Sequence, residues 1–590
     1  MRLRPIALLL AALFVGGLVF YVVTRDGARR PNVLLISIDS LRQDMVGAYG
    51  FESPYAPGIS SSPNIDRLAA EGLLLENAHS TTSWTLPSHM TLLTGVPEIL
   101  HGVDIDNHAP DEDFPLLSEY LQDEGYRTSG FYSGPYLSAD PWRFDRGFDT
   151  YEACYGDDLK AATLAKAKLI AEAKRRESGE AGLPTTRQFQ EQLNQAILRE
   201  EVASHNDIST KNVTDAALAA IDAAVEEGDP FFVFAHLFDP HYDYIPPATF
   251  ASRFDPEYQG AVTGKNFMGN AQISLPNAAA GKPGARTQVA SQRDMEHIRA
   301  LYAGELAWVD DQIRRLLEKL EEKGLRENTI VIVTSDHGDE FFEHGSLGHR
   351  NTLYEEITRI PMIISWPEQI KVPRKLSTLV SNVDLAPTIL DWLDISHDMR
   401  GASLAPLLEG RRDLEDRRII GRMVRAWPMG ITVPNKRGEP QQFPAEMITH
   451  YESFHHGTIK ILREVQWPRV GEAVRKLLSP ATVTELDTQK ATAKANQVVR
   501  WIDLAFDPTE RDENWSTDFS APAAREALDE FQRVYRKLNA ERSEEIDPDD
   551  PSFVDTSSMQ GLIKGTGYAG SSDEQIPQSE FALGAPRASN

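Results

Sequence analysis

The sequence predicts an α/β fold, with a mainly parallel or mixed central sheet flanked by helices and a smaller C-terminal α+β subdomain. Two observations support this prediction. Short apolar runs rich in β-branched or aromatic residues are typical of strands buried on both faces, and they lie at residues 33–38, 231–235, 330–333 and 362–365. Between them are segments with apolar residues at helical spacing, at residues 65–71, 116–124 and 310–323. Strands that alternate with helices form a mainly parallel sheet covered by helices.

Glycines mark the ends of two of these helices. Gly125 and Gly324 stand where C-terminal caps belong, because glycine adopts the left-handed backbone of a cap without steric cost. Residues 157–228 are rich in Ala, Lys, Glu and Gln, which predicts a helical insertion between two core strands. Residues 260–292 are polar, and we expect a surface loop there.

The N-terminal segment, residues 1–30, predicts a membrane anchor. An uncharged and mostly apolar run at residues 6–23 lies between arginines and is just long enough to span a bilayer. Because no clear cleavage site follows, we expect an uncleaved signal-anchor rather than a cleaved signal peptide. Arginines on both sides leave the orientation open. We expect the rest of the chain to be exported, with the catalytic part facing the periplasm or the cell exterior.

The remainder divides into three parts by composition. We expect a catalytic domain at residues 31–419 and a C-terminal subdomain at residues 420–540, with an apolar run at 458–462 and a helix at 523–538. Residues 541–590 are rich in Ser, Asp, Glu, Gly and Pro, which is typical of a largely disordered tail. The tail contains a GxGxxG pattern without a preceding strand or a following helix, so we interpret it as chance.

The composition excludes several classes of function. Lys and Arg number 60 against 88 Asp and Glu, a net charge of −28, which argues against a general nucleic-acid binder. The single cysteine, Cys154, excludes an internal disulfide and a site built from several cysteines. Cys154 lies far from the motifs below, and we expect it to be an inert packing residue. Nothing in the sequence indicates the oligomeric state.

Acidic residues and a histidine follow two of the predicted strands. Asp39 comes directly after the first strand, and Asp336 and His337 follow the strand at 330–333. Ligands of open α/β sheets bind at the carboxyl ends of strands. Each aspartate alone is typical of a helix cap or turn, but the combination predicts a divalent-metal site. Carboxylate and imidazole ligands suit Mn²⁺ or Zn²⁺ better than a pure Ca²⁺ cage.

A threonine lies near the start of the third element of this site, residues 83–95. Pro87 suits the first turn of a helix and Gly95 its end, which places Thr85 just before the helix N-terminus. The free amides and the dipole there favour an anion, either an alkoxide or a bound phosphate. A threonine hydroxyl needs a metal or a base to become a nucleophile, and otherwise Thr85 is merely an N-cap.

This element resembles the sulfatase family of the alkaline phosphatase superfamily. Members carry C/S-x-P-S-R-x-x-x-L-T-G at the head of such a helix, and TLPSHMTLLTG at residues 85–95 aligns without a gap. Thr85 falls on the nucleophile, Pro87 on the proline and His89 on the arginine. Further segments resemble the family in order from about residue 31 to 571, among them RPNVLLISIDSLRQDMVGAYG, PFFVFAHLFDPHYDY and TIVIVTSDHGDEFFEHGSLGH.

The resemblance implies the sulfatase-like fold and one divalent metal ion, which could be Mn, Zn, Ca or Mg. It places Asp39, Asp336 and His337 on metal-ligand positions, and Ser40 where many sulfatases have a further aspartate. His241 falls on a substrate-binding histidine and His349 on a substrate-binding lysine, so the implied catalytic set is Thr85, His241 and His349. Four further residues have less defined positions: His236 and His344 are either site residues or structural histidines, and Glu340 and Asp44 are expected to be structural.

One departure from the family bears on the chemistry. Sulfatases oxidise a Cys or Ser at the nucleophile position to formylglycine, whereas oxidation of the secondary alcohol of Thr85 gives a ketone. Ser83 and Ser88 are out of register. Family members with an unmodified threonine are typically phosphoryl-transfer enzymes. We therefore expect a metal-dependent ester hydrolase or transferase that cleaves a phosphoester through Thr85.

Two alternatives remain open at this point. The chain could be a sulfuric ester hydrolase that works without formylglycine, or an inactive envelope protein that uses the pocket for binding. The expected partner is an anionic ester, and a membrane anchor suggests one linked to a lipid or a polysaccharide. The sequence leaves open whether water or an alcohol accepts the transferred group.

Overall fold

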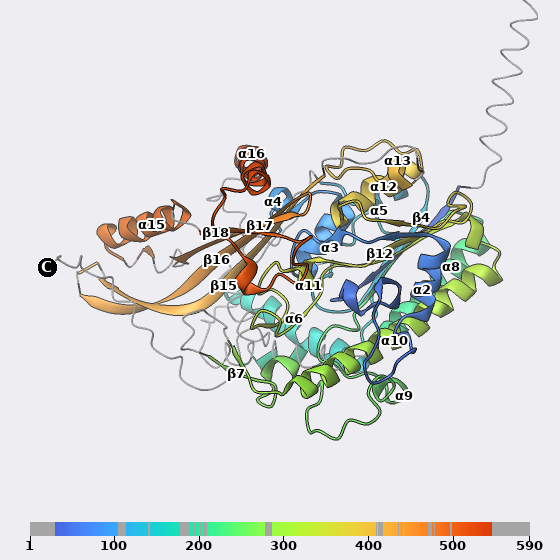
Figure 1. Ribbon diagram of the computed structural model, residues 1–590, viewed down its shortest axis with the longest axis horizontal. Helices are drawn as coiled ribbons and strands as arrows, with labels where there is room; N and C mark the ends of the chain where they lie inside the picture. Colours follow the sequence, from blue (N-terminus) through green and yellow to red (C-terminus); the bar gives the residue numbers. More distant parts are fainter. Residues whose placement is uncertain are drawn as a thin grey trace, which may run out of the picture.

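The computed structural model describes most of the chain between residues 30 and 545 (Figure 1). The described residues are 30–103, 114–139, 142–177, 209–277, 286–408, 417–434, 439–469, 478–495 and 498–545, with isolated positions between 189 and 203 and at 410, 436–437 and 475–476. The predicted anchor, most of the predicted tail and its GxGxxG pattern lie outside these residues. Residues 541–545, which we expected in the tail, are helical.

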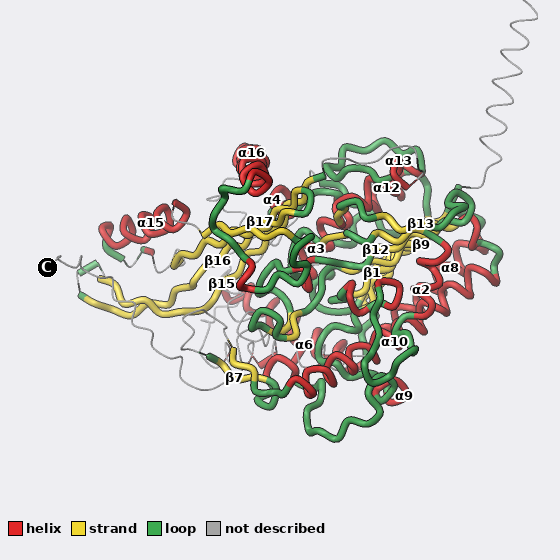
Figure 2. Tube along the Cα trace, in the orientation of Figure 1, coloured by secondary structure: helices red, strands yellow, loops and turns green. Residues whose placement is uncertain are grey.

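A large mixed sheet forms the centre of the molecule (Figure 2). Within the described residues it has eight strands in the order β13-β2-β12-β9-β1-β6-β4-β5. Their bounds are β1 Asn32–Ile38, β2 Leu73–Leu75, β4 Arg127–Tyr132, β5 Thr150–Ala153, β6 Phe231–Leu237, β9 Thr329–Ser335, β12 Met362–Ser365 and β13 Arg374–Leu376. All four strands expected from the sequence are therefore confirmed, and they occupy the four central positions of this order.

 

Strand β1 lies at the middle of this sheet, because its residues are apolar on both faces. It pairs in parallel with β6 on one side and β9 on the other, so that Ile38 stands opposite both Leu237 and Ser335. Strand β12 runs antiparallel to β9, which makes the sheet mixed rather than purely parallel. The carboxyl ends of β1, β6 and β9 consequently meet at one edge of the sheet.

Helices cover both faces of the sheet (Figure 1). Alternate residues of β1 serve opposite faces, as a strand requires: Leu34 and Ile36 pack in one apolar cluster, and Val33 and Leu35 in the other. The first cluster includes residues of α2 Pro63–Glu71, α8 Thr210–Glu227 and α10 Gln292–Glu322. The second includes residues of α3 Thr85–Thr94, α5 Leu117–Asp123 and α12 Leu385–Trp392.

Helix α10 is much longer than the sequence pattern indicated. We expected a helix at 310–323, but α10 begins at Gln292, within the segment expected to be a loop. Ser291 caps it, since the Ser291 hydroxyl accepts a hydrogen bond from the Asp294 amide and the Asp294 carboxylate accepts one from the Ser291 amide. The rest of the expected loop holds the short strands β7 Ser274–Pro276 and β8 Arg286–Gln288. Gly125 and Gly324 have the left-handed backbone expected of them.

A second, antiparallel sheet follows in the C-terminal part. Its order is β15-β16-β17-β18, with bounds Arg418–Pro434, Pro440–His456, Ile459–Arg469 and Val498–Asp503. The helix expected at 523–538 is confirmed as α16 Pro522–Glu545, which packs on this sheet through Phe531 and Phe454. The long strands β15 and β16 extend away from the main body, towards α15 Pro480–Ala495 (Figure 1).

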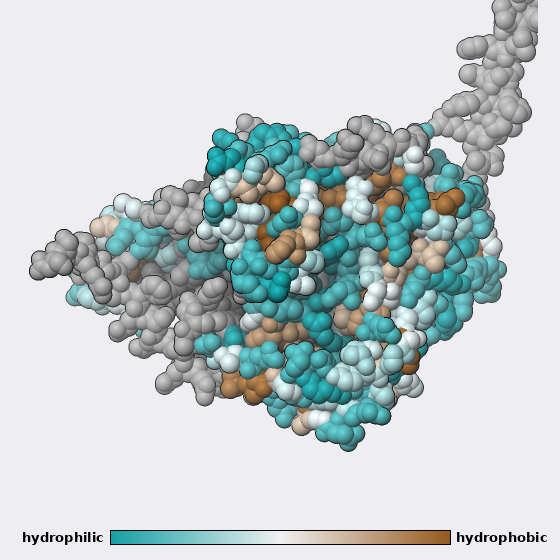
Figure 3. Space-filling model, in the orientation of Figure 1, coloured by the Kyte–Doolittle hydropathy of each residue, from teal (hydrophilic) through white to brown (hydrophobic). Residues whose placement is uncertain are grey.

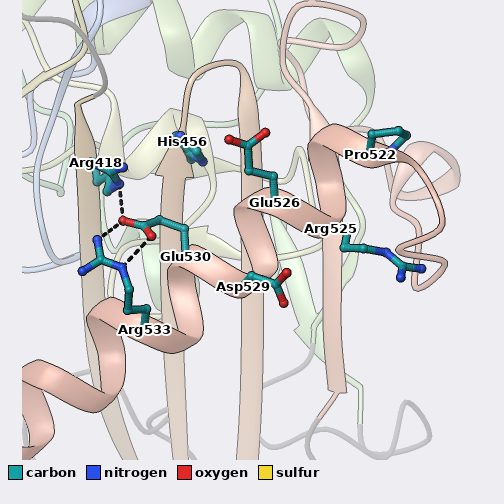
Figure 4. A pocket seen from close by; sticks show the side chains of 8 residues that line it. All are labelled: Arg418, His456, Pro522, Arg525, Glu526, Asp529, Glu530 and Arg533. Carbon is teal, nitrogen blue, oxygen red and sulfur yellow. Dashed lines mark hydrogen bonds and ion pairs between the residues drawn. The ribbon is translucent and has the colours of Figure 1, made fainter.

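The C-terminal sheet docks against the segment that follows α3. Ile99 and Leu100 of α4 Glu98–His101 join one apolar cluster with Phe454, Ile461 and Phe531. Beside this contact, a shallow hollow lies between α16 and the strands (Figure 4). Glu530 in the hollow forms ion pairs with both Arg418 and Arg533.

A buried lysine also joins the two sheets. Lys460 of β17 is fully buried, and its ammonium lies 2.9 Å from Glu355 Oε1 and 2.9 Å from Glu510 Oε1. Glu355 begins α11 Glu355–Thr358 in the main domain, whereas Glu510 follows β18. A buried charge needs partners of opposite sign, so this ion-pair triad fixes how the C-terminal sheet sits on the main domain.

The surface is mostly hydrophilic on the face drawn in Figure 3, as the high content of acidic residues leads one to expect. Within the described part of the chain, no helix combines the length and the apolar character that crossing a bilayer requires.

The triad predicts a large stability effect. Replacing Lys460 by Met leaves Glu355 and Glu510 buried without their cation, and we expect the free energy of unfolding to fall by about 3–5 kcal/mol. Urea denaturation followed by circular dichroism measures the change. Lys371→Met is the matched control, because Lys371 is exposed and its replacement should alter stability by less than about 0.5 kcal/mol. Equal denaturation midpoints for the two variants would contradict the prediction.

Candidate active site

The three predicted metal ligands meet at the carboxyl ends of β1 and β9. The pairing of these strands brings Asp39 beside Asp336 and His337, and all three are buried. His337 Nε2 lies 3.3 Å from Asp336 Oδ2 and 3.8 Å from Asp39 Oδ1. One ligand atom from each residue lies within 4.8 Å of the others, which is close enough to hold a single ion.

Backbone and hydroxyl groups orient the two carboxylates. The Ser40 amide donates to Asp336 Oδ1 at 3.0 Å, and the Ser40 hydroxyl donates to Asp39 Oδ1 at 3.0 Å. The His337 amide also donates to Asp336 Oδ1, at 2.9 Å. Ser40, which stands where many sulfatases have a further aspartate, therefore holds the neighbouring carboxylates in place.

Two imidazoles present lone pairs to these carboxylates. His337 Nδ1 contacts the Gly338 carbonyl at 3.0 Å and His236 Nδ1 contacts the Ser133 carbonyl at 3.0 Å. Because a carbonyl oxygen only accepts, both Nδ1 atoms carry the proton, and in the neutral rings each Nε2 is an acceptor. His236 Nε2 nevertheless lies 3.2 Å from Asp39 Oδ2, which leaves two acceptors facing each other.

The residues present fit a divalent cation. Asp336 Oδ2 and His236 Nε2 are buried and have no hydrogen-bond donor among the described residues. Burial raises the pKa of Asp39 to about 7, and burial followed by the charge of Asp39 raises the pKa of Asp336. Burial by itself would lower the pKa of His337. The negative charges of Asp336 and Asp39 have the larger combined effect, so the pKa of His337 is raised. Carboxylates crowded in this way, with imidazole lone pairs directed at them, are typical of a metal centre.

The Thr85 hydroxyl faces the same cluster. Thr85 Oγ1 lies 3.4 Å from Asp39 Oδ2 and 3.4 Å from His337 Nε2, and the residue is 4% exposed. The helix start differs from our expectation: α3 begins at Thr85 itself, and the N-cap is Trp84, because the Ser88 amide already bonds to the Trp84 carbonyl. The hydroxyl of Thr85 is thus directed at the acidic cluster and does not cap the helix.

His89 has a role that the family motif did not indicate. Its Nδ1 donates to the Thr85 carbonyl at 2.9 Å, and its Nε2 accepts from the Ser37 hydroxyl at 2.9 Å. Burial lowers the pKa of His89 to about 3, so the ring is neutral where the family has a charged arginine. Burial likewise lowers the pKa of His236 to about 4. His89 therefore ties the first turn of α3 to β1 and brings no positive charge to the site.

The two remaining predicted residues lie next to the cluster. The His349 ring is centred 4.3 Å from that of His337 and 5.0 Å from that of His241. His241 follows β6, and its Nδ1 donates to the Tyr242 carbonyl at 2.7 Å. The structure thus brings all six predicted site residues together, from four separate parts of the chain: Asp39, Thr85, His241, Asp336, His337 and His349.

Asp339 is a site residue that sequence reasoning missed. Its Oδ1 accepts from His349 Nδ1 at 2.6 Å, and its Oδ2 accepts from the Tyr244 hydroxyl at 2.8 Å. Burial raises the pKa of Asp339 to about 7, against the charge of His337. The repeated acid in the run Asp336-His337-Gly338-Asp339 was the available signal. Because Asp339 accepts the Nδ1 proton of His349, the Nε2 atom of His349 is the nitrogen that faces away from Asp339.

Asp44 and Cys154 are structural. Asp44 forms an ion pair with Arg42, whose guanidinium also donates to the Asp339 carbonyl. Cys154 is buried, and burial raises the pKa of its thiol to about 12, which makes it inert. Glu340 and His344 belong to a second group of acidic residues, described below.

Comparison with known proteins agrees with this geometry. The model of the family described as "Sulfatase" matches residues 31–395, more than half of the chain. The chain belongs to the sulfatase family. It is therefore a hydrolase of the alkaline phosphatase superfamily, whose enzymes typically use a divalent metal ion.

The similarity to individual members of the family is moderate. The chain is 26% identical to the uncharacterized sulfatase YidJ of Escherichia coli, over 62% of this chain and 68% of that protein. It is 25% identical to the N-acetylglucosamine-6-O-sulfatase of Bacteroides thetaiotaomicron, over 65% of this chain and 72% of that protein. The solved phosphonate monoester hydrolase of Agrobacterium radiobacter shares the fold, with a TM-score of 0.55, 20% identity, and coverage of 88% of this chain and 96% of that one.

The contacts of Asp339 generate a prediction about His349. Asp339→Asn removes the carboxylate that accepts the Nδ1 proton, and the tautomer of His349 is no longer fixed. We expect kcat to fall about 10–100-fold while bound metal is unchanged, because Asp339 is not one of the predicted metal ligands. Steady-state kinetics and elemental analysis measure both. Tyr244→Phe, which removes only one hydrogen bond to Asp339, is the control and should have a smaller effect. An unchanged kcat in Asp339→Asn would refute the role of Asp339.

Proposed function

We propose that this sulfatase-family hydrolase cleaves a phosphoester through Thr85, as a hydrolase or as a transferase. The observation that supports the proposal best is the position of Thr85 Oγ1, 3.4 Å from both Asp39 Oδ2 and His337 Nε2. A hydroxyl at the N-terminus of α3, beside acceptors for its proton, is suited to nucleophilic attack. Thr85 cannot become formylglycine, the aldehyde that sulfatases use.

Asp39, Asp336 and His337 would hold one divalent cation, which when bound supplies Lewis-acid chemistry by lowering the pKa of a hydroxyl and polarising the ester. Oxygen and imidazole donors favour Mn²⁺ or Zn²⁺, with Ca²⁺ and Mg²⁺ as the other options. Thr85 Oγ1 attacks phosphorus, and its bond to phosphorus forms as the bond to the leaving oxygen breaks. His241 and His349 bind the equatorial oxygens or give the leaving oxygen its proton. Water or an acceptor alcohol then attacks the phosphorus of the phosphothreonine, and the bond from phosphorus to Thr85 Oγ1 breaks as the acceptor's proton restores the Thr85 hydroxyl.

Sulfate-ester hydrolysis without formylglycine is the second candidate. It is favoured by the names of the curated relatives, which are mostly sulfatases. The third possibility, an inactive binding protein, would not require a nucleophile, proton acceptors and metal-ligand types to converge as they do here. For the substrate we propose an anionic ester linked to a lipid or a polysaccharide. This class follows from the predicted anchor at residues 1–30, which would keep the catalytic part in the periplasm or outside the cell.

Replacing Thr85 tests the nucleophile. Thr85→Ala should lower kcat on phosphoesters at least about 10³-fold, because the attacking oxygen is lost, whereas Thr85→Ser should retain part of the activity. Ser83→Ala is the control from the same segment and should remain active. Intact-mass and peptide mass spectrometry of the quenched wild type should find a phosphoryl adduct on Thr85. Full turnover of Thr85→Ala on every ester that the wild type cleaves would sink the proposal.

Metal removal separates the three candidates. We expect exhaustive chelation to abolish phosphoester cleavage, and Mn²⁺ or Zn²⁺ to restore it, since the carboxylates need a cation between them. Parallel panels of phosphate and sulfate esters, read beside elemental analysis, measure this outcome. A sulfuryl adduct with sulfatase activity alone would favour the second candidate, and an absence of both bound metal and turnover would favour the third.

A further inference from the structure

A second group of buried acidic side chains lies beside the candidate active site. It joins residues far apart in the sequence: Glu340 of β10 Glu340–Phe341, His344 in the loop after it, Glu356 of α11, and Glu510 from the segment after β18. The first three belong to the main domain and Glu510 to the C-terminal part. None of them belongs to the six-residue cluster around Thr85.

These side chains are close together and shielded from water. One ligand atom from each of His344, Glu356 and Glu510 lies within 4.8 Å of the others. His344 Nε2 is 3.3 Å from Glu356 Oε1, with side-chain exposures of 3% and 7%. Glu340 and Glu510 are fully buried. The arrangement resembles the candidate active site in donor types, with carboxylates and one imidazole, but it has no hydroxyl nucleophile among them.

Two carboxylate oxygens in this group are short of hydrogen-bond donors. Glu340 Oε2 is buried and accepts no hydrogen bond from any described residue, and Glu356 Oε1 has only the ion-pair contact with His344 Nε2. The Thr352 hydroxyl donates to the other oxygen of Glu340. A buried carboxylate oxygen without a donor is costly, which points to a ligand at this position.

The nearby cations are committed elsewhere. Lys460 pairs with both Glu355 and Glu510, so one ammonium serves two carboxylates. Arg42, on the other side, forms its ion pairs with Asp44 and Glu343. Arg299 pairs with Glu343, and Arg425, whose charge acts on Glu340, donates to Asn351. A protonated His344 would balance only one of the two carboxylates Glu340 and Glu356.

The pKa values of Glu340 and Glu510 reflect the mutual repulsion of these carboxylates. Burial, and then the charge of Glu356, raise the pKa of Glu340 to about 8. Burial, with Glu355 and Glu356 acting against Lys460, raises the pKa of Glu510 to about 7. Either protons or a bound cation can relieve such crowding.

We propose a second divalent-cation site formed by His344, Glu356 and Glu510, with Glu340 as the adjacent carboxylate. Three carboxylates and one imidazole suit Mn²⁺ or Zn²⁺. Because Glu510 comes from the C-terminal part, the cation ties that part to the main domain next to the active site. The neighbouring group His79, Glu355 and His455 is a poorer site, because it offers a single carboxylate, whose Oε1 already contacts both the Lys460 ammonium and His455 Nε2.

The test counts ions in the full-length protein with each site disabled in turn. After equilibration with Mn²⁺ and removal of the excess, wild type should hold about two ions per chain, and Asp336→Asn and Glu356→Gln about one each. The double variant should hold none. Glu322→Gln, an exposed helix substitution, is the control and should match wild type. Circular dichroism verifies that each variant is folded.

Diffraction at the manganese absorption edge gives a measurement that needs no variant. We expect an anomalous peak between Glu356 and Glu510 in addition to one between Asp39 and Asp336. A wild type with a single ion, lost in Asp336→Asn and kept in Glu356→Gln, would overturn the proposal and leave His344 as a protonated partner of Glu356. The second site does not depend on the reaction proposed for Thr85, so turnover and ion count can fail separately.

Discussion

The burial of Asp39 and Asp336 side by side is the constraint on which the rest of the site depends. Strands β1 and β9 are paired in parallel, so the residues that follow them emerge at the same edge, and neither carboxylate reaches water. Two adjacent carboxylates in a buried position repel each other unless a cation or a proton lies between them. The hydrogen bonds from Ser40 and from the His337 amide hold both groups despite this repulsion.

The histidines around this pair divide by what their Nδ1 atoms bind. His236, His241 and His337 donate Nδ1 protons to backbone carbonyls, and His349 donates to Asp339. The backbone therefore decides which nitrogen of each ring faces the site, which is how protein scaffolds fix imidazole ligands and proton donors. His89 differs, because both of its nitrogens are used to hold α3 against β1.

The C-terminal sheet is part of the same electrostatic arrangement. Lys460 is brought to Glu355 by β17, and Glu510 is brought to His344 and Glu356 by the segment after β18. The acidic residues behind the active site are therefore balanced, in part, from a separate unit of the chain. This makes docking of that unit a condition for the geometry of the loop that carries His344 and His349, and it links stability to the catalytic edge of the sheet.

The sequence alone determined the α/β class, the four central strands and the six residues expected at the site. Fully buried strands are continuous apolar runs, and the family motif places Thr85, Asp39, Asp336 and His337 in register. The first half of α10 was missed, although Met295, Ile298, Tyr302 and Leu306 are buried at helical spacing. The capping box formed by Ser291 and Asp294 was the local signal for its start.

Only the tertiary structure decided the roles that depend on contacts between distant residues. The neutrality of His89, the bond from Asp339 to His349 and the meeting of Glu510 with Glu356 all join positions that no local pattern connects. Charge state, tautomer and ligand geometry are set by burial and by neighbours in space, and these are properties of the folded chain rather than of any segment of its sequence.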